Sequence, residues 1–313
     1  MNILTRLFVS GAALAVPLVL SAKINRTVEK DFTVQPGGNF KVLTEGGDVT
    51  VKTADTTQLH VTAKEVIRAD SDKEADQVLQ DLNLTFDQQG NDVTVESKYA
   101  KSSSGFHFGS WPPVQVSFVV TVPKNFNLDL RTSGGDIDVA SLKGNVKAHT
   151  SGGELRFERI DGEVDGSTSG GNIELTEGTA RARLSTSGGN VRVDRAGGPT
   201  EVSTSGGDIV LDSVADLISA TTSGGNVRAN LTGPIKRDTT LSTSGGDVRV
   251  RLVKGAAFRL DASTSGGDVN ASGLTLTIEH GGSGKSRLVG AVNGGGPTLK
   301  LRSSGGDITV ETE

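Results

Sequence analysis

The sequence predicts an all-β protein, a parallel β-solenoid (β-helix) with coils of about 18 residues and one short helix near the N-terminus. The tetrapeptide Thr-Ser-Gly-Gly recurs along the chain, and its copies from Thr132 to Thr222 begin 18 residues apart. Apolar and polar residues alternate after each copy, as they do in strands with one buried face. The chain contains 42 Gly but only 10 Phe, one Trp and one Tyr, which is typical of short strands joined by tight turns.

The repeat continues to the C-terminal end of the sequence. Its copies begin at Thr132, Thr150, Thr168, Thr186, Thr204, Thr222, Thr243 and Thr264, with a Ser-Ser-Gly-Gly variant at Ser303. The last three spacings are 21, 21 and 39 residues, so the number of coils stays open. An 18-residue unit is too short for a βαβ crossover but fits one solenoid coil. Constant spacing also favours a solenoid over a hairpin-built sandwich or propeller, which needs no identical turns at identical intervals.

Each unit is expected to contribute two strands. In the first unit, a turn at 133–135 precedes a strand at 136–139, and a second turn near Gly144 precedes a strand at 145–148. Ile137 and Val139 share one face of the first strand, and the threonine that opens each turn closes the inward row. Residues 132–313 are therefore predicted to form the regular solenoid.

Residues 23–131 resemble a divergent start of the same fold. The segment from Glu45 to Val51 repeats the turn and strand of the later units. Between Ser71 and Leu82 the apolar residues fall at helical spacing, and Ser71 with Glu74 forms a capping box, so one short helix is expected there. This region is predicted to cap the N-terminal end of the stack, which would otherwise expose a strand edge.

Residues 1–22 have the three parts of a secretory signal peptide. Arg6 supplies the positive charge, an apolar stretch runs from Leu7 to Leu20, and Ser21 and Ala22 are small. The apolar stretch is shorter than the roughly 20 residues that span a bilayer, so no membrane span is expected after cleavage. We expect an exported protein that is periplasmic, at the cell surface or extracellular. The chain has no cysteine, which excludes disulfides and thiolate metal sites.

The residue after each double glycine forms a column of acidic and amide side chains. Its members are Asp136, Glu154, Asn172, Asn190, Asp208, Asn226, Asp247, Asp268 and Asp307. Gly-rich β-rolls bind calcium through such columns, and the Asp247/Asp268 pair would be the most attractive position for a cation. Those rolls carry Asp in both turns of a coil, whereas the second turns here do not. The column is explained by turn formation, and we predict no metal site.

No motif indicates catalysis or a cofactor. His60, His107, His149 and His280 are scattered, and no Gly-x-Ser-x-Gly occurs. Outward charged rows such as Asp138, Arg156, Glu174 and Arg192 leave a polysaccharide-acting β-helix enzyme as an alternative, although solvated charge explains them. The net charge of −5 comes from mixed acidic and basic residues, which argues against nucleic acid as a partner.

One loop concentrates the scarce aromatic residues. It contains Phe106, His107, Phe108 and Trp111, and exposed aromatics can form a recognition patch. It is a weak candidate recognition loop, since the same residues could instead fold over the end of the solenoid.

The run from Val122 to Ile137, the repeated Ser-Gly-Gly-Asp/Asn and the segment from Asn293 to Pro297 resemble a bacterial family of unknown function, described as putative adhesins with β-strand repeats. The resemblance implies a β-helical exported protein without a known catalytic residue. We expect a noncatalytic structural or adhesin-like binding module of the cell envelope, whose partner is a cell-surface polymer or protein. A self-assembling scaffold is a further alternative, although Glu311 and Glu313 would oppose end-to-end stacking, and the oligomeric state stays open.

Overall fold

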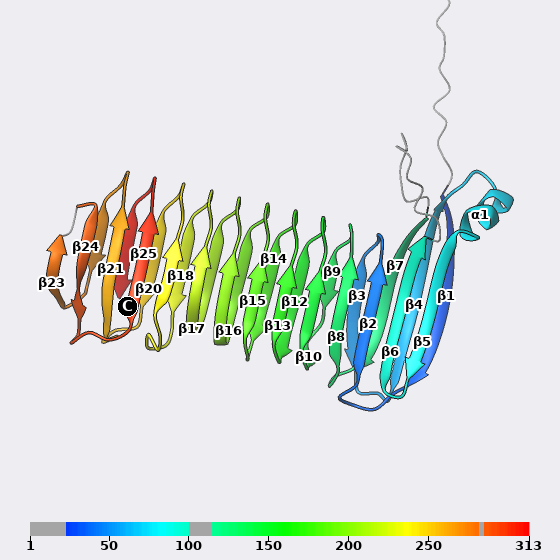
Figure 1. The fold of residues 1–313 in the computed structure, drawn as a ribbon. Coiled ribbons are helices and arrows are strands. Elements are labelled where there is room, and N and C mark those ends of the chain that lie inside the picture. Colours follow the sequence, from blue (N-terminus) through cyan, green and yellow to red (C-terminus); the bar gives the residue numbers. More distant parts are fainter. Residues whose placement is uncertain (1–22, 100–113, 282–284, 313) are drawn as a thin grey trace, which may run out of the picture.

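The computed structural model describes residues 23–99, 114–281 and 285–312. These residues contain 26 strands and one helix, α1 (Asp72–Leu79), and the strands stack side by side into an elongated body with α1 at one end (Figure 1). The all-β class with one short helix is confirmed, and the architecture is solenoid-like. The predicted signal peptide and the aromatic loop lie outside the described residues.

The strands form two facing ladders that are joined through the long strands β16 (Val191–Ser203) and β17 (Ile209–Thr221). In spatial order, the first ladder comprises β1 (Lys23–Thr33), β4 (Gln58–Arg68), β7 (Val114–Pro123), β3 (Val49–Ala54), β9 (Ile137–Val139), β12 (Leu155–Asp161), β14 (Ile173–Gly178), β16, β17, β18 (Val227–Leu231), β20 (Val248–Leu252), β26 (Ile308–Thr312) and β22 (Val269–Ser272).

The second ladder faces the first across the interior. It comprises β5 (Leu82–Gln89), β6 (Asp92–Tyr99), β2 (Asn39–Thr44), β8 (Asn127–Thr132), β11 (Val146–His149), β13 (Val164–Ser167), β15 (Ala182–Ser185), β16, β17, β19 (Thr239–Ser242), β25 (Thr298–Ser303), β21 (Phe258–Thr264), β24 (Arg287–Val292) and β23 (Leu276–Gly281). The short strand β10 (Leu142–Lys143) follows β9 and pairs with the last residues of β12.

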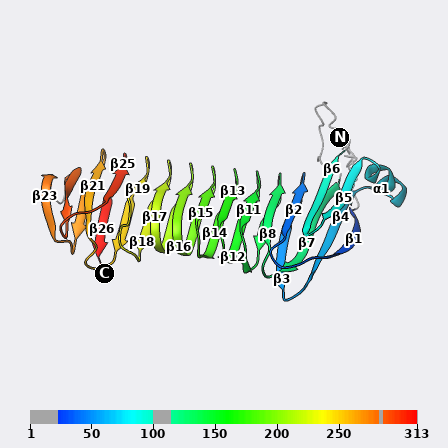
Figure 2. The same ribbon diagram turned by 60° about the horizontal axis from the view of Figure 1, so that its bottom comes forward.

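Pairing is parallel through the middle of the body and antiparallel at its ends. Val146 pairs with Val164, Val164 with Ala182, and Ala182 with Thr200, so each step along the ladder advances the chain by 18 residues. Strands β1, β4 and β7 pair antiparallel at one end, and β21, β24 and β23 do so at the other. Figure 2 shows the same stack from a second direction.

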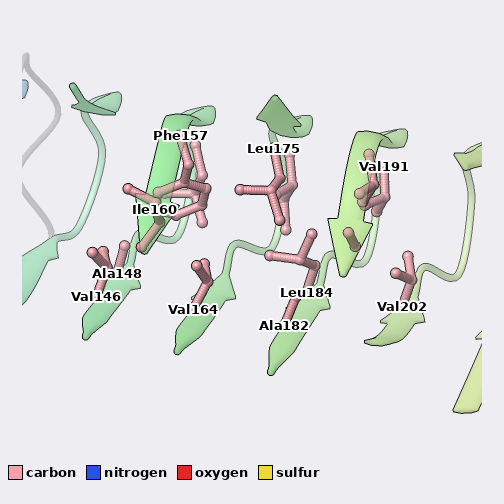
Figure 3. Close-up of a cluster of buried hydrophobic side chains, with 14 of the residues drawn as sticks. Val146, Ala148, Phe157, Ile160, Val164, Leu175, Ala182, Leu184, Val191 and Val202 are labelled. Carbon is pink, nitrogen blue, oxygen red and sulfur yellow. The ribbon is translucent and has the colours of Figure 1, made fainter. Parts of the chain in front are cut away.

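The core is the narrow space between the two ladders. Alternate residues of each strand point inward, so Phe157 and Leu175 of the first ladder face Val164 and Leu184 of the second (Figure 3). These four side chains are at most 2% exposed. Each coil shares its core contacts with the coils above and below, so its stability depends on its neighbours.

The first and the last coil of the sequence are not at the ends of the stack. Strands β2 and β3 lie between β6–β7 on one side and β8–β9 on the other. Strands β25 and β26 lie between β19–β20 and β21–β22, and Figures 1 and 2 both place the C-terminus within the body, away from β23. The expectation that the C-terminal tail opposes end-to-end stacking is therefore wrong, because Glu311 lies in β26, inside the stack.

The inward face of β4 contains one acidic residue, Glu65. Its side chain is only 6% exposed, its register partner on β1 is Arg26, and it forms no hydrogen bond or ion pair within the described part of the chain. Burial raises the pKa of the Glu65 carboxyl above its ordinary value, and the positive charge of Arg26 partly opposes this rise.

We expect Glu65→Gln to stabilise the protein at pH 8 and to leave its stability unchanged near pH 4. The folded state favours the protonated carboxyl of Glu65. Below pH 4.5 this preference contributes fully to the free energy of unfolding, and the contribution is lost as the pH rises through the raised pKa. Ionisation of a buried, unpartnered carboxyl costs about 1–3 kcal/mol, and Gln avoids this cost. Urea unfolding of both proteins at several pH values measures the difference; an equal difference at pH 4 and pH 8 would contradict the prediction.

Candidate functional site

A hollow crosses the outer face of the second ladder in the N-terminal half of the body. We call it the outer groove. It has a volume of about 760 Å³ and is lined by β6, β2, β8, β11, β13 and β15. Its polar and charged lining residues are Asn39, Lys41, Asp92, Thr94, Asn127, Asp129, Asn145, Lys147, Glu163, Asp165, Arg181 and Arg183.

Strand alternation explains why these side chains face outward. Phe40, Leu128, Val146 and Val164 are buried between the ladders, so the residues on either side of them in sequence point to the opposite face. Register pairing then places one charged row across five neighbouring strands, about 4.8 Å apart at each step. From β2 to β15, the row reads Lys41, Asp129, Lys147, Asp165 and Arg183, with the sign alternating at every strand.

A ladder of asparagine side chains forms one rim of the groove. Asn127 Oδ1 accepts a hydrogen bond from the backbone N–H of Asn145 at 3.0 Å, and Asn145 Oδ1 accepts one from the N–H of Glu163 at 2.9 Å. Asn39 accepts from Asn127 Nδ2 at 3.1 Å and donates to Asp92 at 2.7 Å. These bonds tie the side chains of neighbouring coils to the backbone and fix the shape of the rim.

The charges of the groove differ in whether they are already paired. Arg181 and Arg183 donate to Glu201 at 2.5 and 2.9 Å, and the hydrogen bond from Arg183, followed by that from Arg181, lowers the pKa of the Glu201 carboxyl. Asp129 accepts from Arg131 at 3.0 Å. Within the described residues, no side-chain ion pair or hydrogen bond is made by Lys41, Lys147, Glu163 or Asp165. The groove therefore offers two free lysines and two free carboxylates.

The charged row on the first ladder behaves differently. Asp138, Arg156, Glu174 and Arg192 align across β9, β12, β14 and β16, as the repeat spacing predicts. Arg156 donates to Asp138 at 3.2 Å and also pairs with Glu154, and the bond to Asp138 raises the pKa of Arg156. Arg192 pairs with Asp194 at 2.8 Å. Both arginines of this row are thus held in ion pairs within the protein.

The column after the double glycines forms a structural ladder. The backbone N–H of Glu154 donates to Asp136 Oδ1 at 2.8 Å, and the N–H of Asp208 donates to Asn190 Oδ1 at 2.8 Å. Below this column, the Oγ1 of each repeat threonine donates to a glycine carbonyl of the neighbouring coil, as Thr150 does to Gly135 at 2.9 Å. Most column oxygens thus accept from the next coil, which supports the turn interpretation.

The expected Asp247/Asp268 pair is not adjacent. Asp307 of the inserted C-terminal coil lies between them. Its N–H donates to Asp247 Oδ1 at 2.8 Å, and its Oδ1 accepts from the N–H of Asp268 at 2.9 Å. Among the residues that the structure describes, no group of three or more His, Asp or Glu side chains is arranged to hold a metal ion.

The described histidines are separate. His60 in β4 contacts Asp31 at 2.7 Å, and His149 in β11 contacts Ser167 at 2.8 Å. The aromatic loop candidates Phe106, His107, Phe108 and Trp111 lie outside the described residues.

The residues on either side of that loop are bonded to each other. Tyr99 Oη accepts from the N–H of Val114 at 2.8 Å and donates to the carbonyl of Val114 at 3.1 Å. Burial raises the pKa of Tyr99 to about 12. This bond holds the end of β6 beside the start of β7.

The outer groove was not anticipated from the sequence. Asp129, Lys147, Asp165 and Arg183 recur at the 18-residue period, so four of the five residues in its charged row followed the repeat. Lys41 and Asp92 line the groove only because β2 pairs with β8 and β6 pairs with β2. Nothing in the repeat spacing indicates these pairings.

The fold and the corner ladders define a solenoid-like all-β protein built from Gly-Gly turns. The chain belongs to the family described as Toastrack DUF4097, which matches residues 39–311. No protein with a curated function matches the sequence. No helix within the described ranges is long and apolar enough to cross a membrane.

Several solved structures are similar to this chain at low sequence identity. A putative adhesin from Parabacteroides merdae is 15% identical in sequence and has a TM-score of 0.48. The match covers 92% of this chain and 96% of the adhesin chain. A putative adhesin from Bacteroides fragilis is 12% identical with a TM-score of 0.39, covering 92% and 97%. A putative lipid binding protein from Parabacteroides distasonis is 13% identical with a TM-score of 0.39, covering 91% and 96%.

Proposed function

We propose that the protein is a noncatalytic binding module of the bacterial cell envelope and that it holds an extended anionic polymer in the outer groove. The observation that carries this proposal is the pair of free lysines, Lys41 and Lys147, in a hollow of about 760 Å³ on otherwise regular strands. Free charges in a concave surface are available to a ligand, whereas the paired arginines on the first ladder are not.

The direction of the groove favours a long ligand. The hollow crosses six strands, so a polymer lying in it would meet a new set of side chains about every 4.8 Å. Lysine offers a compact charge on a flexible stem, and the asparagine rim offers amide donors. Such contacts suit carboxylate or phosphate groups carried on a polar chain, with Asp129 and Asp165 selecting where along the chain those groups can lie.

The residue types favour binding over catalysis. Glycoside cleavage needs two opposed carboxyl groups, one of them with a raised pKa. Glu163, directly before β13, and Asp165, within it, are both exposed and lie two residues apart on one outward face, so they are not opposed across the groove. The described lining of the groove includes no histidine or serine that would act as a base or nucleophile.

The envelope location rests on the N-terminal sequence. Residues 1–22 carry the pattern of a signal peptide, and a mature chain without cysteine is compatible with an oxidising compartment. A rigid, elongated body with a lateral groove suits a protein that holds a polymer at a surface.

The double variant Lys41→Glu/Lys147→Glu is expected to weaken binding of an anionic envelope polymer at least tenfold, because two attractive charges become repulsive. Mature protein, residues 23–313, would be screened by biolayer interferometry against lipopolysaccharide, teichoic acid and acidic polysaccharides. Affinity should also fall with added salt, since the groove is open to solvent.

The matched control is Lys52→Glu/Lys64→Glu, which makes the same change in net charge at exposed positions outside the groove. It should retain the affinity of the unmodified protein. An equal loss in both double variants would indicate a nonspecific charge effect, and absence of binding to every polymer in the screen would reject the proposed function.

A further inference from the structure

The C-terminal segment completes the stack as an inserted coil. We call residues 298–312 the terminal coil and the space that it occupies, between β19–β20 and β21–β22, the coil slot. On one side, the N–H groups of Thr243 and Val248 donate to the carbonyls of Arg302 and Asp307 at 3.0 and 2.9 Å. On the other side, the N–H of Ile308 donates to the carbonyl of Asp268 at 2.9 Å.

Side chains secure the terminal coil on both sides. Its four inward residues have no exposed surface; they are Leu299, Leu301, Ile308 and Val310. Ser303 Oγ donates to the carbonyl of Gly246 at 2.8 Å, and Thr264 Oγ1 donates to the carbonyl of Gly306 at 2.7 Å. Arg302 pairs with Asp261 of β21 at 2.5 Å.

The walls of the coil slot come from earlier parts of the chain than the coil that fills it. Both of its walls, β19–β20 and β21–β22, precede the terminal coil in sequence. While the slot is empty, the walls expose four unpaired strand edges, those of β19, β20, β21 and β22. The gap between the walls corresponds to two strand spacings, about 10 Å. Any segment with the sequence of the terminal coil would make the same contacts there, including one from another molecule.

The link that leads to the terminal coil contains four successive residues with positive φ. Asn293 has a φ of 51° and is the single non-glycine residue with a positive φ in the described part of the chain. Gly294, Gly295 and Gly296 follow with φ values of 91°, 83° and 156°. Glycine adopts this backbone without strain, so the strain of the closed hinge lies at Asn293. Strain in a short hinge favours domain swapping.

We propose that the coil slot also binds the terminal coil of a second copy of this chain, which produces strand-exchanged dimers and, if exchange does not close, longer assemblies. Every contact of the terminal coil is retained in such an exchange, and only the hinge changes. Fully extended, the hinge of five residues from Asn293 to Pro297 reaches about 17 Å. Exchange is set during folding, when the slot is open, and increases with protein concentration.

Cysteine trapping tests the exchange directly, because the chain has no cysteine of its own. Thr240 on β19 and Lys300 on β25 are register partners whose side chains point outward. One copy would carry Thr240→Cys and the other Lys300→Cys, and the two would be refolded together at increasing concentration and oxidised. Neighbouring strands place the two cysteines within disulfide range only when the terminal coil of one copy fills the slot of the other.

We expect a disulfide-linked heterodimer whose yield rises with concentration and exceeds several-fold that of a mixture of Thr240→Cys and Lys64→Cys copies, which are not register partners. The double variant in one chain should give an internal disulfide and reports that the geometry permits bonding. Melting curves of each single variant confirm folding before the copies are mixed.

Hinge variants supply a second readout by light scattering. Asn293→Gly relaxes the closed hinge and should lower the dimer fraction several-fold, whereas deletion of Gly294 and Gly295 prevents closure and should raise it. A heterodimer yield no higher than that of the Lys64→Cys mixture at every concentration would overturn the proposal. The result does not depend on the outer groove, since Thr240 and the hinge lie outside it.

Discussion

Gly135→Ala is expected to lower the free energy of unfolding by more than about 4 kcal/mol, which is exceptional for the addition of one methyl group. Gly135 is the second glycine of a repeat corner and lies directly over the backbone of the neighbouring coil. A Cβ placed there would lie 2.1 Å from the carbonyl oxygen of Gly47 and 2.2 Å from its carbonyl carbon. Backbone atoms of a parallel ladder cannot move away without breaking its hydrogen bonds.

The same close approach recurs through the stack. At Gly153, Gly171 and Gly189, a Cβ would lie 2.0 Å from the carbonyl oxygen of the corresponding glycine in the preceding coil. A shift at one corner would therefore disturb the contact with the adjacent coil. The second glycine is required by the spacing of the coils, and this requirement explains why it recurs with the repeat.

Gly134→Ala is the matched control, since it changes the adjacent residue of the same turn. A Cβ at Gly134 would meet no atom within 4 Å, and its φ lies outside the left-handed range. The expected change in the free energy of unfolding is smaller than about 1 kcal/mol, because alanine also restricts the unfolded chain. Urea unfolding of both variants measures the difference; equal destabilisation would show that turn flexibility, and not coil spacing, accounts for the glycine pair.

The repetitive part of the fold could be predicted from the sequence because stacked coils keep the 18-residue period of the repeat. The inward residue Val146 is the register partner of Val164, and Val164 is that of Ala182. Residues at the same position of successive repeats are therefore neighbours in the stack. The helix near Ser71 could be predicted for a local reason, since the hydroxyl of Ser71 accepts from the N–H of Glu74 at 3.3 Å, which is one half of a capping box. The Glu74 carboxylate accepts from the N–H of Asp70 at 3.0 Å, one residue before the position that a capping box uses.

The positions of β2–β3 and of β25–β26 within the stack could not be predicted from the sequence. They depend on pairing between segments that are far apart in the chain. Spacing alone puts Asp268 after Asp247, yet Asp307 lies between them. The 39-residue gap before Ser303 was the one sign of this arrangement. The gap contains β23 and β24, which form the end of the stack. The chain then continues into β25 and β26, which occupy the coil slot.

The outer groove depends on the same long-range stacking. Lys41 and Asp129 are separated by 88 residues in sequence but occupy register-paired positions on β2 and β8. Sequence alternation indicates only that each side chain points outward. Which charges become neighbours, and which of them stay unpaired, follows from the insertion of β2 beside β8.

Removal of residues 298–313 is expected to abolish cooperative folding of the C-terminal half, even though chain ends usually tolerate truncation. The deletion removes four fully buried side chains, Leu299, Leu301, Ile308 and Val310. At roughly 1.5–3 kcal/mol each, their burial contributes about 6–12 kcal/mol, which is comparable to the whole stability of a typical domain. It also leaves the facing edges of β20 and β22 without their shared partner.

Hydrogen exchange of the truncated chain would locate the effect. Amides of β19 to β24 should lose protection, whereas those of β4 and β7, at the far end of the stack, should keep it, since coils interact mainly with their neighbours. Ile278→Ala is the control: Ile278 lies in β23 at the spatial end of the stack and is 54% exposed, so its truncation should cost less than about 0.5 kcal/mol. Retained protection in β19 and β21 after the deletion would show that the walls of the coil slot are stable without the coil that fills it.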